Sequence, residues 1–338
     1  MNNGLAIRRI AVLTLLAAVL SGLLIYSLCV SGVHTLSLSE CLAALAGKGE
    51  SGELFVFRQL RLPRSAAALG CGILLGIGGA VLQMILRNPL ASPDILGISS
   101  GGGLAGLALL MFLPDRPEYL GVVTFAGALT MAALIYFAAW KRGVSPGQLV
   151  LTGVALSALA GAGNTVLLML NSDRLTGIFE FTLGGFAGVG INDLKLLTVT
   201  LLLTVTGVGF LARKLDLLAL GDDGAASLGV NVELLRLAAL ALAALAAAGS
   251  AATAGLLGFA GLVAPHLVRL LGNGGQSAYI LSGSALMGGI LTVAGDTLGR
   301  LLAPAGHELP AGIFLTFAGA LFFIWLLLIK RGAGVWQQ

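Results

Sequence analysis

The spacing of charged residues constrains this chain more than any other feature. Nine stretches of at least 17 residues contain no Asp, Glu, Lys or Arg. A helix needs about 20 apolar residues to cross the roughly 30 Å hydrocarbon core of a bilayer, so these stretches predict membrane-spanning helices. Spanning β-barrels alternate apolar and polar residues, and these long apolar runs do not. The stretches are 10–39, 65–86, 95–114, 119–140, 143–172, 196–212, 237–268, 270–295 and 309–329.

Composition excludes an ordinary water-soluble enzyme. Charged residues make up 10% of the 338 residues, whereas soluble domains carry about 25% charge. Gly accounts for 50 residues, about twice its usual share of roughly 7%. We therefore expect an all-α polytopic membrane protein whose residues 1–338 form a single transmembrane domain.

One charge-free stretch, 237–268, predicts two helices instead of one. Its 32 residues would form a helix of about 48 Å at 1.5 Å per residue, too long for a single crossing. Gly255, Gly258 and Gly261 offer points where the chain can turn back. Doubling this stretch gives ten spans, at approximately 10–30, 65–86, 95–113, 119–140, 148–170, 196–212, 237–254, 257–268, 278–300 and 311–329.

The basic residues at the two ends favour an even number of spans. Arg8 and Arg9 precede the first span, and Lys330 and Arg331 follow the last. Basic flanks stay in the cytoplasm, so both termini are expected there. A cleaved signal peptide is the alternative for the first span, but no small-x-small cleavage site precedes His34.

Residues that could carry chemistry are sparse. Cys29, Cys41 and Cys71 give neither a disulfide framework nor a metal-ligand spacing. No G-x-x-x-x-G-K-[ST] motif occurs, so ATP binding through a P-loop is not expected. No acidic residue lies in the middle of a predicted span, where an ion-coupled carrier typically keeps one. Asn164 is the main strongly polar side chain at depth.

Three arginines on the predicted outer side, Arg58, Arg61 and Arg64, oppose the usual charge bias. They recur every three residues, so a helical turn would place them on one face. Pro63 suits the first turn of the next helix. The arginines could contact lipid headgroup phosphates, or they could form bidentate pairs with carboxylates of an acidic partner. Arg300 is predicted on the same surface, four residues after Asp296 in an i,i+4 pair.

The inner loop 87–97 contains two prolines and predicts a tight turn. Asp94 is placed to begin the next helix. Gly97 then opens a series of glycines that favours close helix packing over phosphate binding. The others are Gly101, Gly102, Gly103 and Gly106.

The longest inner loop, 213–236, predicts a short helix lying on the cytoplasmic face. Gly221 and Gly229 bracket the segment, and Asp222 and Asp223 fall in its first turn, where the helix dipole favours negative charge. A calcium loop is excluded because no later Glu stands at the required position. The helix could be a plain connection or a docking element for a cytosolic protein.

Pro265 predicts that the eighth span is short or broken, because proline removes a helix hydrogen bond. His266 beside it could be a ligand or a proton relay, although a structural hydrogen-bonding role is the simpler interpretation.

Six motifs occur together in one order along the chain. They are RLPR at 61–64, GGAVLQMILRNPLASPDILGISSG at 78–101, LDLLALGDDGAASLGV at 215–230, GFAGLVAPHLVR at 258–269, GDTLGR at 295–300 and ELPAG at 308–312. With them the whole chain resembles the FecCD/BtuC family, the permeases of type II ABC importers for iron-siderophore complexes, haem or vitamin B12.

The resemblance implies a BtuC-like bundle of ten transmembrane helices and assigns roles to residues. Arg61, Arg64 and Arg300 would dock a binding protein through its glutamates. The ATPase would be contacted by coupling residues in the 213–236 loop, and a cytoplasmic gate would lie at the start of the fifth span. Coupling residues are Leu217, Leu220, Gly221, Asp222, Asp223, Ala226, Leu228 and Gly229; gate residues are Ser145, Pro146 and Gly147; the path residue is Asn164; structural motif residues are Asn88, Pro89, Gly97, Pro265 and His266.

Pro146 departs from the family pattern, in which the gate residues have small side chains that carry a hydroxyl group.

The resemblance further implies two permease subunits (a homodimer, or a heterodimer with a paralogue), two cytosolic ATPases that use the ATP, and a periplasmic or lipid-anchored binding protein. The chain itself would bind no cofactor and no metal, catalyse no reaction, bind no nucleic acid and lie in the bacterial cytoplasmic membrane.

A ferric siderophore or ferric citrate is the expected cargo, and haem or cobalamin the alternative. Two rival classes fit less well. An ion-coupled carrier needs a titratable group within a span, and an intramembrane enzyme needs a nucleophile or metal cluster at depth, which His34, His266 and His307 near span ends do not supply.

Overall fold

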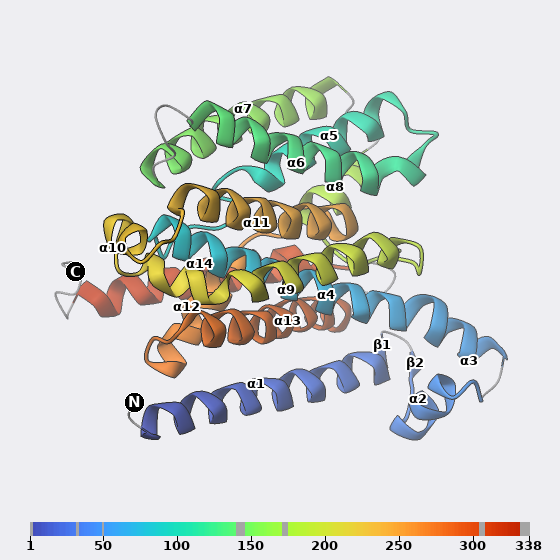
Figure 1. Ribbon diagram of the computed structural model, residues 1–338. Coiled ribbons are helices and arrows are strands. Elements are labelled where there is room, and N and C mark those ends of the chain that lie inside the picture. Colours follow the sequence, from blue (N-terminus) through green and yellow to red (C-terminus); the bar gives the residue numbers. More distant parts are fainter. Residues whose placement is uncertain are drawn as a thin grey trace.

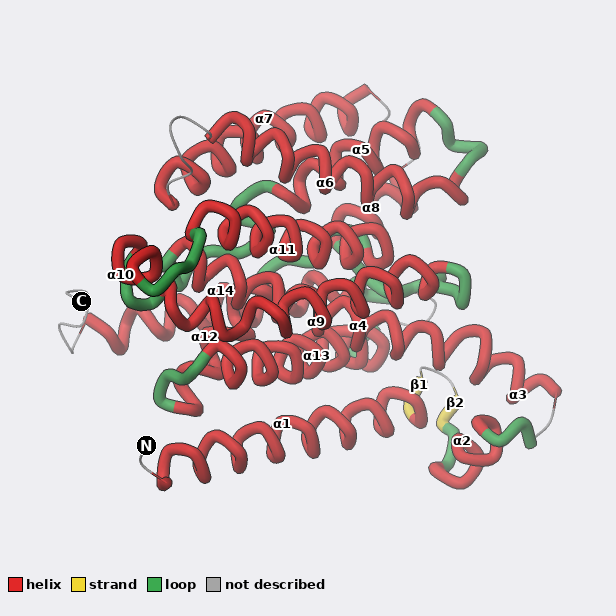
Figure 2. Tube along the Cα trace, viewed as in Figure 1, coloured by secondary structure: helices red, strands yellow, loops and turns green. Residues whose placement is uncertain are grey.

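Helices make up nearly all of the computed structural model, which describes residues 3–31, 34–48, 51–139, 146–170, 175–303 and 308–331. Figures 1 and 2 show them as one bundle. The helices are α1 (Asn3–Cys29), α2 (Leu38–Leu45), α3 (Ser51–Phe55), the π-helical turn η1 (Val56–Arg61), α4 (Leu62–Leu86), α5 (Ile98–Phe112), the 3₁₀ turn η2 (Pro117–Tyr119), α6 (Leu120–Ala139), α7 (Pro146–Leu170), α8 (Leu175–Leu183), α9 (Asp193–Leu218), α10 (Asp222–Ser227), α11 (Val232–Ala254), α12 (Ala260–Gly272), α13 (Ser277–Leu301) and α14 (Ala311–Arg331). Two short strands, β1 (Val30–Ser31) and β2 (His34–Thr35), pair antiparallel after α1.

The all-α polytopic fold class is confirmed. Within the described ranges seven helices are long and apolar enough to cross a membrane, and three shorter apolar helices, α5, α12 and part of α14, accompany them. A helix lies in each of the ten expected spans. In Figure 1 the start of α1, the end of α14 and the short α10 lie at the left end of the bundle, whereas α2 and the β1–β2 hairpin lie at the right end. We call these the α10 end and the α2 end.

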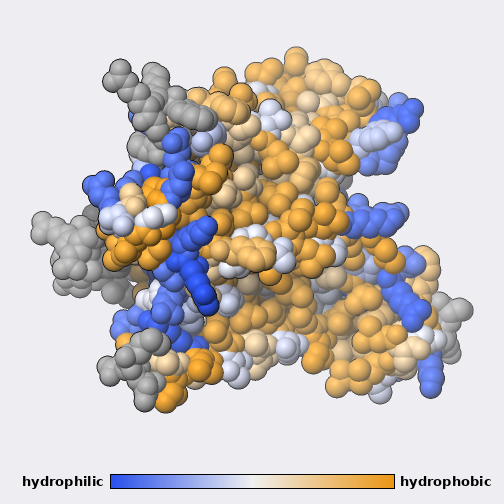
Figure 3. Space-filling view, viewed as in Figure 1, coloured by the Kyte–Doolittle hydropathy of each residue, from blue (hydrophilic) through white to orange (hydrophobic). Residues whose placement is uncertain are grey.

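The surface agrees with a membrane-embedded bundle. Figure 3 shows hydrophobic side chains over the middle of the visible face and hydrophilic ones gathered toward the two ends. Large apolar side chains such as Phe210 and Leu151 are 85% and 73% exposed, which lipid tails tolerate and water does not. That the α10 end faces the cytoplasm stays a prediction.

Helix α4 is the centre of the packing, contacting α9, α11, α12 and α13. Glycines allow the approach, because a Cβ on Gly76 would lie 2.0 Å from the Ser284 carbonyl oxygen of α13. A Cβ on Gly79 would lie 1.7 Å from the Gly261 carbonyl oxygen of α12. Thr292 donates a hydrogen bond of 2.7 Å to the Ala68 carbonyl, which ties α13 to α4 about two turns of α4 before Gly76.

The long stretch 237–268 does contain two helices, α11 and α12, as its length predicts. Gly255 ends α11 with φ +69°, a left-handed conformation that glycine adopts without strain. Helix α12 has 13 residues and contains Pro265, so the prediction of a short eighth helix is confirmed.

Pro63 lies in the first turn of α4, as expected, although α4 continues directly from α3 and the π-helical turn η1. Two local predictions differ from the structure. Helix α5 begins at Ile98 after Gly97, and Asp94 does not cap it but lies in the preceding turn. Helix α8 and helix α2 occupy segments that the charge spacing left as loops.

We predict that Gly76→Ala destabilises the bundle. The new Cβ would press on the α13 backbone, which cannot move aside as a side-chain tip could, and overpacking costs about 1–3 kcal/mol. Thermal unfolding of the purified protein in detergent measures the effect. Gly22→Ala on α1 is the matched control, because nothing lies within 4 Å of its added Cβ; equal unfolding midpoints for the two variants would contradict the close α4–α13 contact.

Candidate functional site

The α2 end holds a charge network that joins α4, α13 and the segment before α14. Arg64 of α4 pairs with Asp296 of α13 at 2.8 Å and with Glu308 at 2.5 Å. Asp296 also pairs with Arg300 at 3.2 Å, which confirms the i,i+4 pair. The Asp296 side chain is only 2% exposed, and the two guanidinium groups beside it offset the cost of burying a carboxylate.

Arg61 and Arg300 are directed at the C-terminal end of α1. Arg61 Nη1 donates to the carbonyls of Leu28 at 3.1 Å and Cys29 at 3.3 Å. Arg300 Nη1 donates to the Ser27 carbonyl at 3.0 Å. The last carbonyls of a helix lack partners within the helix and carry its negative dipole end, so cations are favourable there.

The structure brings the three predicted docking arginines to one end of the bundle but exposes them unequally. Arg61 and Arg300 are 4% and 7% exposed, and their guanidinium groups donate hydrogen bonds to carbonyls at the end of α1. The Arg64 side chain is 13% exposed, and Glu308 beside it is 49% exposed. Docking stays a prediction, and Arg64 is the member that a partner could reach with least rearrangement.

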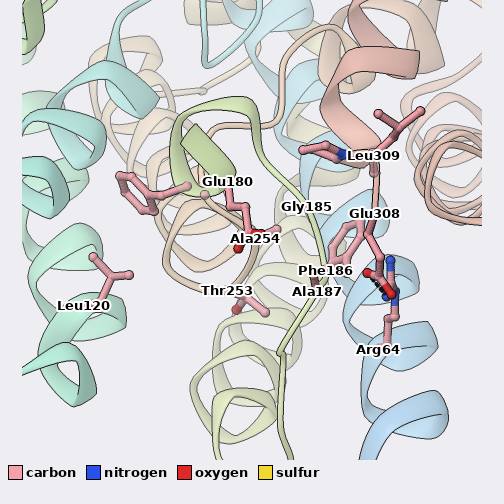
Figure 4. A pocket seen from close by; sticks show the side chains of 14 residues that line it. Arg64, Leu120, Glu180, Gly185, Phe186, Ala187, Thr253, Ala254, Glu308 and Leu309 are labelled. Carbon is pink, nitrogen blue, oxygen red and sulfur yellow. Dashed lines mark hydrogen bonds and ion pairs between the residues drawn. The ribbon is translucent and has the colours of Figure 1, made fainter. Parts of the chain in front are cut away.

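A cavity of about 180 Å³ opens beside Arg64 (Figure 4). Glu180 of α8 and Glu308 contribute carboxylates to its wall, and Phe181 and Phe186 contribute rings. In Figure 4 the Arg64 and Glu308 side chains meet at one side, while Glu180 lies across the cavity. Nothing in the sequence pointed to Glu180, because helix α8 itself was not expected.

At the α10 end, one carboxylate holds the predicted short helix in place. Helix α10 begins after Gly221 with Asp222 and Asp223 in its first turn, as expected. Asp222 accepts hydrogen bonds from Arg87, which follows α4, and from Arg236 of α11 at 2.8 Å. These two arginine partners were missed, because they lie 135 and 14 residues away in sequence.

The surface around α10 is partly apolar. Ala225 is fully buried against the bundle, whereas Leu220 and Leu228 on either side are 64% and 58% exposed. Gly221 and Gly229 have φ of +96° and +82°, so each glycine permits a sharp turn at an edge of the helix. Of the other expected coupling residues, Leu217 lies at the end of α9 and Ala226 within α10.

The 87–97 loop packs into the bundle through its second half. The Asn88 side chain accepts from the Leu90 amide at 2.9 Å, which forms the turn containing Pro89. A Cβ on Gly97 would lie 2.8 Å from Ser157, so this glycine lets the start of α5 approach α7. Burial raises the pKa of Asp94 to about 6, although hydrogen bonds from Ser99 and the Phe259 backbone oppose that rise.

Asp94 lines a second cavity, of about 620 Å³, between α5, α8, the 256–258 turn and α14. Its wall is mostly apolar, with Ser99, Ser100, Thr182 and Thr316 as the other polar side chains. Asn164 of α7 does not line it; its Oδ1 is buried and accepts no hydrogen bond from a described residue. Of the gate residues, Ser145 lies outside the described residues, and Pro146 and Gly147 begin α7.

His266 packs against the aromatic side chains of α14. Its ring lies edge-on to Phe322 at 5.7 Å and to Phe323 at 5.9 Å. Among the residues that the structure describes, no group of three or more His, Cys, Asp or Glu could hold a metal ion.

Comparison with known proteins extends over nearly the whole chain. The profile described as the FecCD transport family matches residues 10–329. The Fe(3+)-citrate import system permease protein YfmE of Bacillus subtilis (strain 168) is 37% identical over 321 residues, covering 95% of each chain. The achromobactin transport system permease protein CbrC of Dickeya dadantii (strain 3937) is 38% identical over 310 residues, covering 89% of this chain and 87% of that one.

A solved structure has the same fold. It is an inward-facing conformation of a metal-chelate type ABC transporter, superposes with a TM-score of 0.83 at 29% identity, and covers 94% of this chain and 99% of its own.

We predict that Asp296→Asn strongly destabilises the protein. Removing this carboxylate leaves Arg64 with only the half-exposed Glu308 and Arg300 without its acidic partner, and breaking a buried pair typically costs about 3–5 kcal/mol. Thermal unfolding in detergent measures the loss. Glu308→Gln is the matched control, expected to cost less than about 1 kcal/mol because that pair is partly exposed; a larger loss for the control would contradict the central place of Asp296.

Proposed function

The chain belongs to the FecCD transport family, and we propose that it is the membrane-spanning permease subunit of an ABC importer that carries an iron chelate. The observation that carries this is the full-length match to relatives named for ferric citrate and achromobactin transport, on a fold shared with a metal-chelate transporter. The permease itself is not an enzyme. A separate ATPase supplies the energy, in keeping with a sequence that has no P-loop motif.

The α2 end receives the substrate-loaded binding protein in this proposal. Arg64 is the direct contact, because its guanidinium lies next to the exposed Glu308 and an incoming carboxylate can share it. Arg61 and Arg300 contribute indirectly, because they hold the end of α1 next to the same charge network. The cavity beside Arg64 and Glu180 would then form the mouth of the transport path.

The α10 end engages the cytosolic ATPase. Helix α10 presents Leu220 and Leu228 to the outside, and apolar side chains that become buried in an interface supply much of its binding free energy. Asp222 ties this helix to Arg87 at the end of α4 and to Arg236 at the start of α11. Movement of α10 is therefore transmitted to two helices of the bundle core.

The transport path runs between these two ends, beside a second permease subunit. The cavity at Asp94 has few polar groups, so the permease discriminates little between chelates and the binding protein selects the cargo. Asn164 is a path residue, and Ser145, Pro146 and Gly147 form the cytoplasmic gate. Both termini lie in the cytoplasm, and the protein resides in the cytoplasmic membrane.

Reconstitution tests the proposed function. The permease with its ATPase and binding protein in liposomes is expected to accumulate ferric citrate only when ATP is supplied, and the permease alone is expected to accumulate none. Concentrative uptake by the chain alone without nucleotide would show an ion-coupled carrier instead. ATP-dependent uptake of haemin or cobalamin in place of ferric citrate would keep the importer and replace the cargo.

We predict that changes at the two ends separate the two partners. Arg64→Gln is expected to weaken binding-protein affinity at least tenfold, because a charge-assisted hydrogen bond contributes about 1.5–3 kcal/mol. Leu220→Asp combined with Leu228→Asp is expected to weaken ATPase association about 100-fold, since burying each leucine contributes about 1.5 kcal/mol or more. Affinities are measured with the complex in detergent.

Each of these variants controls for the other, because Arg64→Gln leaves the α10 surface intact and the double variant leaves Arg64 intact. Glu233→Gln, on the exposed first turn of α11, is the control for charge near α10. Loss of both partners in one variant, or of neither, would contradict the assignment.

A further inference from the structure

Two cysteines that are separate in sequence meet at the α2 end. Sγ of Cys29, the last residue of α1, lies 3.5 Å from Sγ of Cys41 in α2. Cys41 is 3% exposed, and Cys29 is half-buried. Together with Ala44 and Phe57 they form a small apolar cluster that lies apart from the main core.

The segment between the two cysteines reverses direction and brings α2 back to the end of α1. The β1–β2 pair reverses its direction after α1, and the Leu36 amide donates to the Cys29 carbonyl at 2.9 Å. Ser37 and Glu40 then form a capping box: the Ser37 amide donates to Glu40 at 2.7 Å, and the Glu40 amide donates to Ser37 Oγ at 3.3 Å. This cap fixes where α2 begins and so turns Cys41 toward α1.

Two arginines of η1 hold the same elements from the other side. Arg58 donates to the carbonyls of Ala44 at 3.2 Å and Leu45 at 3.3 Å, at the end of α2. Arg61 donates to the last carbonyls of α1, including that of Cys29. The two helices that carry the thiols are thus held in place independently of any bond between the two sulfurs.

We propose that Cys29 and Cys41 form a disulfide that fastens α2 to the end of α1. The proposal rests on the proposed function for its orientation, in which the α2 end faces the outside of the cytoplasmic membrane. Disulfides persist on that side and are reduced in the cytosol. Cys71, by contrast, is fully buried within α4 with its Sγ 3.8 Å from the Ser250 carbonyl, and it stays a thiol.

The bond forms by exchange with an external disulfide, such as that of a thiol oxidoreductase or of oxidised glutathione. Cys29 is the more exposed thiol, so its thiolate attacks first, forming a mixed disulfide and releasing one oxidant thiolate. The Cys41 thiolate then attacks Cys29 Sγ and releases the second. Two protons and two electrons pass from the cysteines to the oxidant, which becomes two thiols. Burial raises the pKa of Cys41 to about 11, which suits the resolving role better than the attacking one.

The bond would stabilise the docking end by restricting the chain before folding. Closing a loop between residues 12 apart removes conformations from the unfolded state, and it does so without new contacts in the folded state. It would also fix the carbonyls that Arg61 contacts, so the charge network around Arg64 keeps its support while a partner docks and leaves.

Differential alkylation of the full chain in its native membrane tests the bond. Free thiols are first blocked with N-ethylmaleimide under denaturing conditions, then the protein is reduced and treated with iodoacetamide, and peptides are read by mass spectrometry. We expect N-ethylmaleimide on Cys71 and iodoacetamide labels on Cys29 and Cys41. N-ethylmaleimide on all three cysteines, or a crosslink between two copies of the chain, would overturn the proposal.

Thermal unfolding of cysteine variants provides a second test of the disulfide. Reductant is expected to lower the thermal midpoint of the wild type by a few degrees, to that of Cys29→Ser and Cys41→Ser, whose own midpoints should not respond to reductant. Cys71→Ala is the matched control and should retain the reductant-dependent shift. A wild-type midpoint that is unaffected by reductant would contradict a stabilising disulfide.

Impermeant reagents separate this proposal from the proposed orientation. In intact cells, an impermeant reductant followed by an impermeant maleimide is expected to label Cys29, the more exposed of the two thiols. If the bond is present but its reduction requires permeabilised cells, the disulfide stands and the orientation of the permease is wrong. If the maleimide labels Cys29 without reductant, the orientation stands and the disulfide is wrong.

Discussion

Close contact between helix backbones is the constraint on which the rest of this structure depends. In a bilayer the hydrophobic effect does not drive helices together, so association relies on packing and on hydrogen bonds between helices. Helix α4 meets both requirements, because Gly76 and Gly79 bring its backbone against α13 and α12, and Thr292 donates to Ala68 across the first of these contacts. Charged groups at both ends are then positioned by helices that are already in register.

Each end uses one carboxylate to bind two arginines. Asp296 lies between Arg64 and Arg300 at the α2 end, and Asp222 lies between Arg87 and Arg236 at the α10 end. The burial differs, since Asp296 is 2% exposed and Asp222 is 44% exposed. The first network is therefore a structural element of the bundle, whereas the second leaves α10 anchored but accessible.

The sequence predicted the helical class and the ten helix positions because charge spacing and span length act locally. It predicted α10 from Gly221 and Asp222, and the pair of Asp296 with Arg300, for the same reason. It did not predict that Arg61 and Arg300 would cap α1, because that contact joins residues 32 and 273 positions apart. The proximity of Cys29 and Cys41 could not be predicted from the sequence either, because no strong sequence signal marks the β1–β2 pair that brings them together.

The unbroken run from η1 through α4 spans 31 residues, or about 46 Å at 1.5 Å per residue, which exceeds the thickness of the hydrocarbon core. One continuous helix thus joins Arg58 and Arg61, which contact helix ends at the α2 end of the bundle, to Arg87, which contacts α10. Because this helix is continuous, a tilt imposed on it at one membrane surface must displace its end at the other surface. This helix bends most easily at the π-helical turn Val56–Arg61, which lies next to a proline that cannot donate a backbone hydrogen bond.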